Sequence, residues 1–305
     1  MQHSLDRAHD FARRAGTALS SIVPMMGGVR PAFWPGWPNH GGVPMPVARS
    51  QTIDPEVSQI VHVWSRCVRR SFLCGQDELL GRDYEHRREW VQKRIEKLAS
   101  VYAIDIISYA VLHNHHHELL RTRPDVVAKL SNEQVVRRWM NLNSDRYFRA
   151  DGKDRKSTKS KVKTLVNDKK FMKKIRRNLS DISKFMQSLN QSIAIRANRE
   201  DGLEGKFFEK RFGHEVLADT PDVLACNLYI DLNPIHAQIA NTPEESEHTA
   251  AYERINDLRM FLVEHEEEQK GEQDGEDGKQ DGEQKGKQPR TLAINLSQTG
   301  SEFHK

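Results

Sequence analysis

Cysteine is scarce in this chain of 305 residues, and it has no long hydrophobic run. The three cysteines, Cys67, Cys74 and Cys226, form neither a close-spaced metal motif nor an even set for disulfides, which suits a reducing compartment. No apolar run approaches the roughly 18 residues that a membrane helix needs, and the N-terminus lacks the apolar core of a secretory signal. We therefore expect a soluble cytoplasmic protein without a membrane partner.

The charges are unevenly distributed along the chain. The net charge is only +4, from 47 basic and 43 acidic residues. Residues 264–283 hold ten acidic residues against two lysines, so the rest of the chain carries about +12. Residues 146–177 alone contain fourteen lysines or arginines against three acidic residues. A basic run of this kind is either a solvated surface or a set of phosphate contacts.

Composition also separates the two ends from the middle of the chain. Residues 1–50 form a leader whose second half is dense in proline and glycine, and residues 263–305 form a low-complexity tail of acidic and polar residues. Neither segment can bury a core, so both are expected to be disordered. Between them, residues 51–262 are expected to form one domain, with residues 125–177 as a basic helical insertion.

Hydrophobic periodicity within the domain predicts both strands and helices. Apolar alternation indicates a strand at residues 59–67, and helical spacing indicates one helix around residues 90–102 and another around residues 179–193. This mixture, with strands and helices following one another, predicts an α+β fold.

Four histidines occur within five residues at the end of an apolar run, YAVLHNHHHELL, at residues 109–120. In an extended chain successive side chains alternate between faces, so His115 and His117 project together and are able to hold one divalent cation. His113 joins that face if the run is extended from its start. The alternative is a half-exposed strand end with only adventitious metal affinity.

A second motif, LYIDLNPIHA, follows at residues 228–237. Upstream of it, Thr220 is expected to be the N-cap of a helix that has Pro221 at its first position. Tyr229 and Asn233, four residues apart, would then lie on one face, with Pro234 disturbing or ending the helix. Taken alone, this pair is more typical of packing than of chemistry.

Together the two motifs resemble those of the single-tyrosine transposases of the HUH superfamily, in the REP-associated and insertion-sequence branch. The similarity extends to VHVWSRCVRR at residues 61–70, FMQSLN at 185–190 and GKFFEKRF at 205–212, and spans residues 59–255 in all. The resemblance implies a ferredoxin-like (RRM-like) antiparallel sheet with packed helices. It further implies a DNA transposase or strand transferase that cleaves and rejoins single-stranded or hairpin DNA.

The resemblance also assigns roles to residues. It implies that His115 and His117 bind the metal, Mg²⁺ or Mn²⁺, with Asn233 as a polar third ligand, and that Tyr229 is the nucleophile. The expected intermediate is a 5′-phosphotyrosine, whose bond conserves the energy needed for rejoining. The implied partner is DNA, in a nucleoid-associated cytoplasmic protein for which both a monomer and a homodimer are open.

This chain departs from the family pattern at four positions. His113 replaces a proline, His116 replaces a bulky hydrophobic residue, Glu118 replaces an apolar residue, and His236 stands where arginine is common. None of these changes removes a proposed catalytic group, and His113 and Glu118 stay candidates for additional contacts with the metal or the active site.

Basic residues in three regions are candidates for DNA contacts. For the aromatic pair Phe207 and Phe208, stacking on bases and packing in the core are equally good interpretations. The basic candidates are Arg66, Arg69, Arg70, Lys156, Lys159, Lys161, Lys163, Lys169, Lys170, Lys173, Lys174, Arg176, Arg177, Lys210 and Arg211.

Three other functions remain open. The first is a DNA-binding regulator derived from a transposase that has lost its chemistry. The second is an HUH nickase of the relaxase or replication-initiator kind, which the short chain, the single candidate tyrosine and the absence of helicase motifs make a weaker hypothesis. The third and most remote is a zinc hydrolase that uses the alternate histidines.

Overall fold

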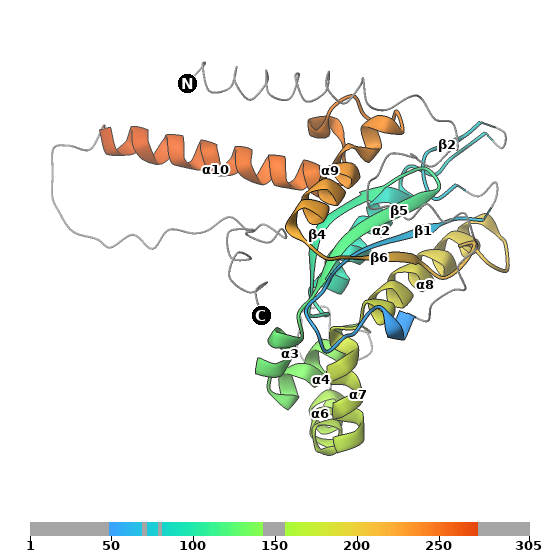
Figure 1. The fold of residues 1–305 in the computed structure, drawn as a ribbon, viewed down its shortest axis with the longest axis vertical. Coiled ribbons are helices and arrows are strands. Elements are labelled where there is room, and N and C mark those ends of the chain that lie inside the picture. The colour runs from blue at the N-terminus through green and yellow to red at the C-terminus, as the bar shows by residue number, and fades with distance from the viewer. Residues whose placement is uncertain (1–48, 69–71, 79–80, 143–155, 274–305) are drawn as a thin grey trace. The chain divides into compact units, whose positions relative to one another are not determined.

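The computed structural model describes residues 49–68, 72–78, 81–142 and 156–273 (Figure 1). The expected disorder of residues 1–48 and 274–305 therefore lies outside the described residues. In chain order the elements are η1 (Arg49–Gln51), β1 (Ile60–Arg66), β2 (Gln76–Asp77), β3 (Arg82–Asp83), α2 (Arg87–Ala99), β4 (Ile104–Val111), β5 (His115–Thr122), α3 (Pro124–Lys129), α4 (Asn132–Asn141), α6 (Lys156–Asn167), α7 (Lys169–Leu179), α8 (Ile182–Asp201), β6 (Gly213–Leu217), α9 (Thr220–His236), η2 (Pro243–Glu245) and α10 (Ala250–Gln273).

Four strands form one antiparallel sheet in the order β4-β5-β1-β6, and β2 and β3 form a separate short hairpin. Helix α2 connects β1 to β4, and the insertion with α8 connects β5 to β6. This is the split β-α-β-β-α-β pattern of the ferredoxin-like fold. The structure therefore confirms the predicted α+β class and the antiparallel sheet.

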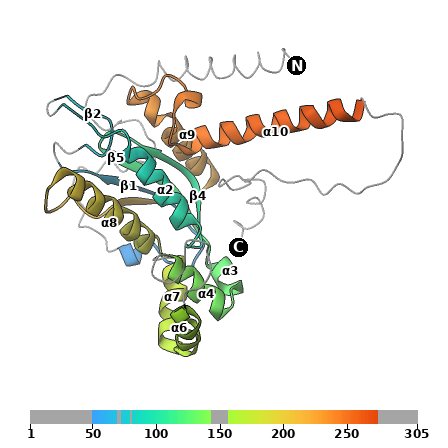
Figure 2. The same ribbon diagram turned by 180° about the vertical axis from the view of Figure 1, so that it is seen from behind.

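Helices cover both faces of the sheet because its strands alternate apolar side chains to each side. Seen from behind in Figure 2, α2 and α8 lie against one face, where the main core contains Val61, Val63 and Phe185. Helix α9 packs on the other face in a smaller cluster that includes Leu119 and Ile230. Burial on both sides is clearest in β4, IDIISYAV, where seven of the eight residues are buried.

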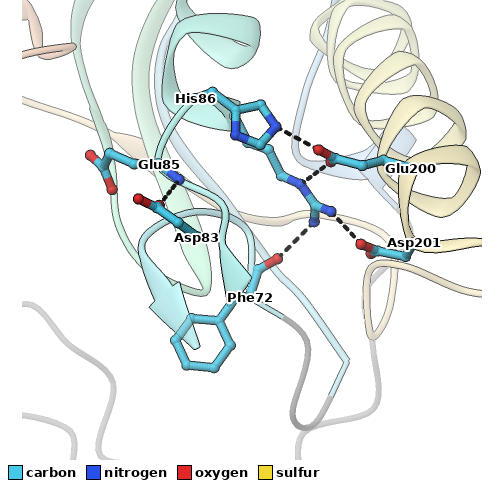
Figure 3. Close-up of polar contacts among 7 residues, drawn as sticks. Phe72, Asp83, Glu85, His86, Glu200 and Asp201 are labelled. Atoms are coloured by element: carbon cyan, nitrogen blue, oxygen red, sulfur yellow. Dashed lines mark hydrogen bonds and ion pairs between the residues drawn. The ribbon is translucent and has the colours of Figure 1, made fainter. Parts of the chain in front are cut away.

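A buried arginine fastens the start of α2 to the end of α8 (Figure 3). The Arg87 side chain is fully buried and donates hydrogen bonds to Glu200 at 2.6 Å and to Asp201 at 2.5 Å. It also donates to the carbonyl of Phe72 at 3.2 Å and stacks over the ring of Tyr84 at 4.0 Å. A buried guanidinium needs this degree of pairing, since an unpaired buried charge is strongly destabilising.

The histidine-rich run is two strands and not one. The backbone N–H of Leu112 donates to the carbonyl of His115 at 2.8 Å, so the chain reverses direction at His113 and Asn114 between β4 and β5. The carbonyl of His113 instead accepts from the backbone of the segment after β1, at Leu73. His113 was expected to share a face with His115 and His117 only if the whole run were one extended strand. Because the chain turns at His113, it does not.

The insertion is helical, as predicted, and consists of α3, α4, α6 and α7 in its described part. Ser131 and Gln134 form a capping box at the start of α4, and Asp168 caps α7. The apolar sides of α4 and α7 meet through buried residues such as Met140 and Ile175. The insertion thus adds its own packed layer, and its described lysine side chains are exposed.

One predicted element boundary was wrong. Asp219, and not Thr220, caps α9, because its carboxylate accepts from the backbone N–H of Asp222 at 2.9 Å. The helix also continues two residues past Pro234, to His236. Helix α10 runs from Ala250 to Gln273. Within the described ranges, no helix is long and apolar enough to cross a membrane.

Candidate active site on the α9 face of the sheet

Three imidazoles gather on the face of the sheet that α9 covers. His115 and His117 come from the start of β5, and their ring centroids lie 5.0 Å apart. His62 comes from the neighbouring strand β1, where Trp64 is the residue directly opposite His117. The Nε2 atom of His62 lies 2.9 Å from the Nδ1 atom of His117. The predicted pair of metal ligands is thus brought together, with a third histidine that the sequence interpretation did not include.

Helix α9 brings Tyr229 to the same group. The Tyr229 ring lies edge-on to His117 at 5.7 Å between centroids and to His62 at 6.3 Å. Asn233, one helical turn further on, is buried, and its side chain lowers the pKa of the phenol. The structure therefore gathers all four residues to which the resemblance assigned catalytic or ligand roles.

The imidazoles are neutral at physiological pH because the site is buried. Burial lowers the pKa of His62 to about 4. It also lowers the pKa of His115 to about 4, with a smaller effect from the nearby Arg66 guanidinium. The pKa of His117 is held well below 6.5, first by burial and then by the neighbouring imidazoles. A neutral imidazole keeps one nitrogen lone pair, which is the form that binds metals.

The Tyr229 phenol is held in its protonated form. Burial raises its pKa above 10, and the Asn233 side chain offsets part of that rise. Attack by this oxygen therefore requires that its charge be stabilised during the reaction.

The donor set fits a divalent cation with two imidazoles and one amide. The buried Nε2 of His117 and Nδ2 of Asn233 have no hydrogen-bond partner. A half-turn of the Asn233 amide exchanges its nitrogen and oxygen, which presents the oxygen as a ligand instead. Across the described ranges, no group of three His, Cys, Asp or Glu side chains is arranged to hold a metal ion. A cation here would therefore depend on the Asn233 amide as its third protein ligand.

Polar contacts of Asp231 fix the rotation of α9, and with it the position of Tyr229. The Asp231 carboxylate accepts from Ser108 on β4 at 2.7 Å and from Asn227 at 2.9 Å. It also pairs with Arg254 on α10 at 2.5 Å, and Arg254 donates to the carbonyl of Ile107 at 3.1 Å. Helix α9 is thus tied to both the sheet and α10.

The other two candidate site residues lie elsewhere. Glu118 and His116 face the α2 and α8 side, where the Nδ1 of His116 lies 2.5 Å from the Glu118 carboxylate. The other ring nitrogen of His116 lies 3.1 Å from Asn190, which donates to Ser65 at 2.7 Å. The His113 side chain lies in the β4–β5 turn, against Gly75. The alternation of β5 therefore separates Glu118 from the His115 and His117 face.

The basic candidates for DNA contacts are mostly exposed. Arg66 is exposed and pairs with His115 across β1 and β5, at the edge of the site. Arg69 and Arg70 lie outside the described residues, and the side chain of Lys156 is not described. The remaining exposed candidates are Lys159, Lys161, Lys163, Lys169, Lys170, Lys173, Lys174, Arg177, Lys210 and Arg211.

Arg176 differs from the other basic residues of the insertion. Its guanidinium donates to the carbonyls of Val127 at 2.9 Å and Leu130 at 2.8 Å, and to the Asn132 side chain at 2.7 Å. These bonds close the end of α3 against α4 and α7, so Arg176 has a structural role. Of the aromatic pair, Phe207 is buried in the main core and Phe208 packs beside it, which favours core packing over base stacking.

Sequence reasoning missed His62 and Asp231. A signal for His62 was present, because it alternates with Ile60 and Trp64 on the strand predicted at residues 59–67. Which strand pairs with β5 could not be known from spacing. Asp231 gave no signal, since its partners Ser108 and Arg254 are distant in sequence.

No family model and no curated protein matches the chain. Among solved structures, that of a REP-associated tyrosine transposase bound to a REP hairpin matches with a TM-score of 0.37. The two sequences are 12% identical, and the match covers 65% of this chain and 79% of that chain.

Proposed function

We propose that this protein is a metal-dependent single-tyrosine DNA transposase, which cleaves and rejoins single-stranded or hairpin DNA through a 5′-phosphotyrosine intermediate. The observation that carries the proposal is the meeting of Tyr229 with neutral imidazoles on one face of the sheet. A surface histidine cluster with adventitious affinity would not need a buried phenol and a buried amide beside it.

The residues present suit each step of phosphodiester cleavage. When bound, Mg²⁺ or Mn²⁺ neutralises the negative oxygens of the scissile phosphate and so lowers the barrier to attack. His115, His117 and the Asn233 amide are the residues that would hold it. The Tyr229 oxygen attacks phosphorus, the 3′ oxygen leaves as a free hydroxyl, and the 5′ phosphate stays on the tyrosine. A second 3′-OH then reverses the step, so rejoining needs no ATP.

Asn233 has a second role in this mechanism. Its side chain lowers the pKa of the Tyr229 phenol and so favours the phenolate that develops during attack. Water is excluded on one side by the packing of α9 on β4 and β5.

The charged surface suits a polyanionic substrate longer than one nucleotide. Arg66 lies beside His115, and the lysine-rich insertion begins just after Thr122, at the far end of β5. Thr122 lies five residues beyond His117 on β5, which corresponds to roughly 17 Å. Basic groups at both ends of β5 would therefore contact phosphates several nucleotides apart, as in a hairpin stem next to a cleaved strand.

The test is covalent capture of DNA. The purified protein is incubated with 3′-labelled single strands and hairpins from its own genomic flanks, with Mn²⁺ or with EDTA, and resolved on denaturing gels. We expect a protein-linked label that requires the metal and is lost in Tyr229→Phe, while Tyr252→Phe on α10 serves as the matched control and retains it. DNA binding by Tyr229→Phe should be unchanged.

A protein that binds its flanking DNA but never forms the adduct would contradict the proposal. It would favour the regulator without catalysis. Adduct formation that persists in Tyr229→Phe would instead assign the nucleophile to another residue.

A further inference from the structure

His62 has no part in the proposed donor set, and yet it is closely packed within the site. It is 2% exposed, and its ring stacks on that of His117 with 5.1 Å between centroids and 23° between planes. The Trp64 ring also lies against the His62 ring, with 5.1 Å between centroids and 41° between planes. A histidine fixed in this way, with its Nε2 2.9 Å from the Nδ1 of His117, controls where the proton of His117 resides.

Only one nitrogen of a neutral imidazole carries a proton. If the Nδ1–H of His117 donates to His62, then the Nε2 of His117 keeps its lone pair. If His62 donates instead, then the Nε2 of His117 must carry the proton. That Nε2 atom is buried and has no protein acceptor. A buried N–H without an acceptor is costly, and no cation can satisfy it, whereas a buried lone pair is satisfied by a cation.

The other proposed ligand shows the same arrangement. The Nδ1 atom of His115 lies 2.7 Å from the Oδ1 atom of Asn114. A carbonyl oxygen only accepts, so the Nδ1 of His115 is the donor and its Nε2 keeps the lone pair. Hydrogen bonds at Nδ1 would therefore leave both imidazoles with Nε2 free for one cation.

We propose that His62 is a positioning residue, which accepts the Nδ1–H of His117 and so holds the Nε2 of His117 unprotonated for a divalent cation. This inference rests on the proposed function, because it concerns the metal site of the proposed transposase. Outer-sphere acceptors of this kind fix the tautomer and the orientation of metal-bound histidines. A ligand role for His62 itself conflicts with the absence, throughout the described ranges, of three His, Cys, Asp or Glu side chains around a common metal position.

The first measurement needs no variant. The metal-free protein, labelled with ¹⁵N in its histidines, is studied by long-range ¹H–¹⁵N correlation spectroscopy, which distinguishes the two neutral tautomers. We expect His117, assigned from His117→Gln, to be protonated at Nδ1 and not at Nε2. A His117 that is protonated at Nε2 would overturn the inference, whether or not the protein binds metal.

The second measurement is Mn²⁺ affinity by titration calorimetry. His62→Leu removes the acceptor and should weaken binding about 10- to 100-fold. His62→Gln keeps a carbonyl acceptor near the position of Nε2 and should retain most of the affinity. His214→Leu is the matched control, since His214 lies opposite Val63 on β6 and faces away from the site. Thermal unfolding of each variant checks that it is folded.

The outcomes separate this inference from the proposed function. If the wild type binds Mn²⁺ and His62→Leu binds it equally well, the positioning role is wrong and the metal site stands. If His62→Gln is as weak as His62→Leu, the acceptor role is wrong and His62 is a ligand. If the wild type does not bind Mn²⁺ at all, the proposed function fails, while the spectroscopic result still decides the hydrogen bond between His62 and His117.

Discussion

Buried neutral histidines make the stability of this protein depend on pH in a way that one substitution can isolate. Burial lowers the pKa of His62 to about 4, against 6.5 for an exposed imidazole. Below pH 6.5 the unfolded chain therefore binds a proton at this position that the folded protein excludes. The free energy of unfolding should fall as the pH drops from 6.5 toward 4, and should be unaffected by this group above pH 7.

The magnitude follows from the two pKa values. At pH 5, an imidazole with a pKa of 6.5 in the unfolded chain and about 4 in the folded protein reduces the free energy of unfolding by about 2 kcal/mol. His62 is 2% exposed, so solvent screening does little to reduce this value. A loss of this size is a large fraction of the stability of an ordinary domain.

The assay is urea denaturation of the metal-free protein at pH 7.5 and pH 5.0, for the wild type and for His62→Gln. Glutamine does not titrate and retains an acceptor for His117, so the two proteins should differ mainly in pH dependence. We expect the wild type to lose about 2 kcal/mol more than the variant between the two pH values. Equal losses in the two proteins would refute the assignment of a buried, neutral His62.

Two further predictions concern residues outside the donor set. Arg254→Gln removes the ion pair with Asp231 that orients α9. Single-turnover formation of the tyrosine adduct should therefore slow roughly 10- to 100-fold, while the DNA affinity measured by gel shift stays unchanged. An unchanged adduct rate would contradict the role of Asp231 in placing Tyr229. In the insertion, Arg176→Ala should lower the free energy of unfolding by about 2 kcal/mol and leave the salt dependence of DNA binding unaltered. Substitution of the exposed Lys174 by alanine should instead lower the slope of log affinity against log salt concentration by about one, without loss of stability. The reverse pattern would overturn both assignments.

The sequence was informative wherever one residue type repeats at a structural period. Alternation placed β1, and helical spacing placed α2 and α8, because burial on one or two sides imposes those periods directly. The pairing of Tyr229 with Asn233 followed from helical geometry alone. The prediction that His115 and His117 lie on the same face needed only the two-residue period of a strand.

The turn between β4 and β5 was missed for a physical reason. Leu112, His113 and Asn114 contain neither glycine nor proline, so the run lacks the usual signal of a reversal. The turn is stabilised from outside, by backbone bonds to Leu73 and Cys74 in a segment almost forty residues earlier. Contacts of that kind depend on the assembled fold, as does the meeting of His62 with His117.

The packing that supports the candidate site extends into the start of α10. Arg254 and Glu253 lie only a few residues into that helix, yet the first holds Asp231 and the second accepts from Tyr109 on β4 at 2.5 Å. The start of α10 is therefore part of the support for the tyrosine helix. Beyond it, Leu258 and Leu262 are more than half exposed, so the packing that supports the site ends before the acidic residues begin. A truncation after residue 249 should thus impair the placement of Tyr229, although it removes no residue of the candidate site itself.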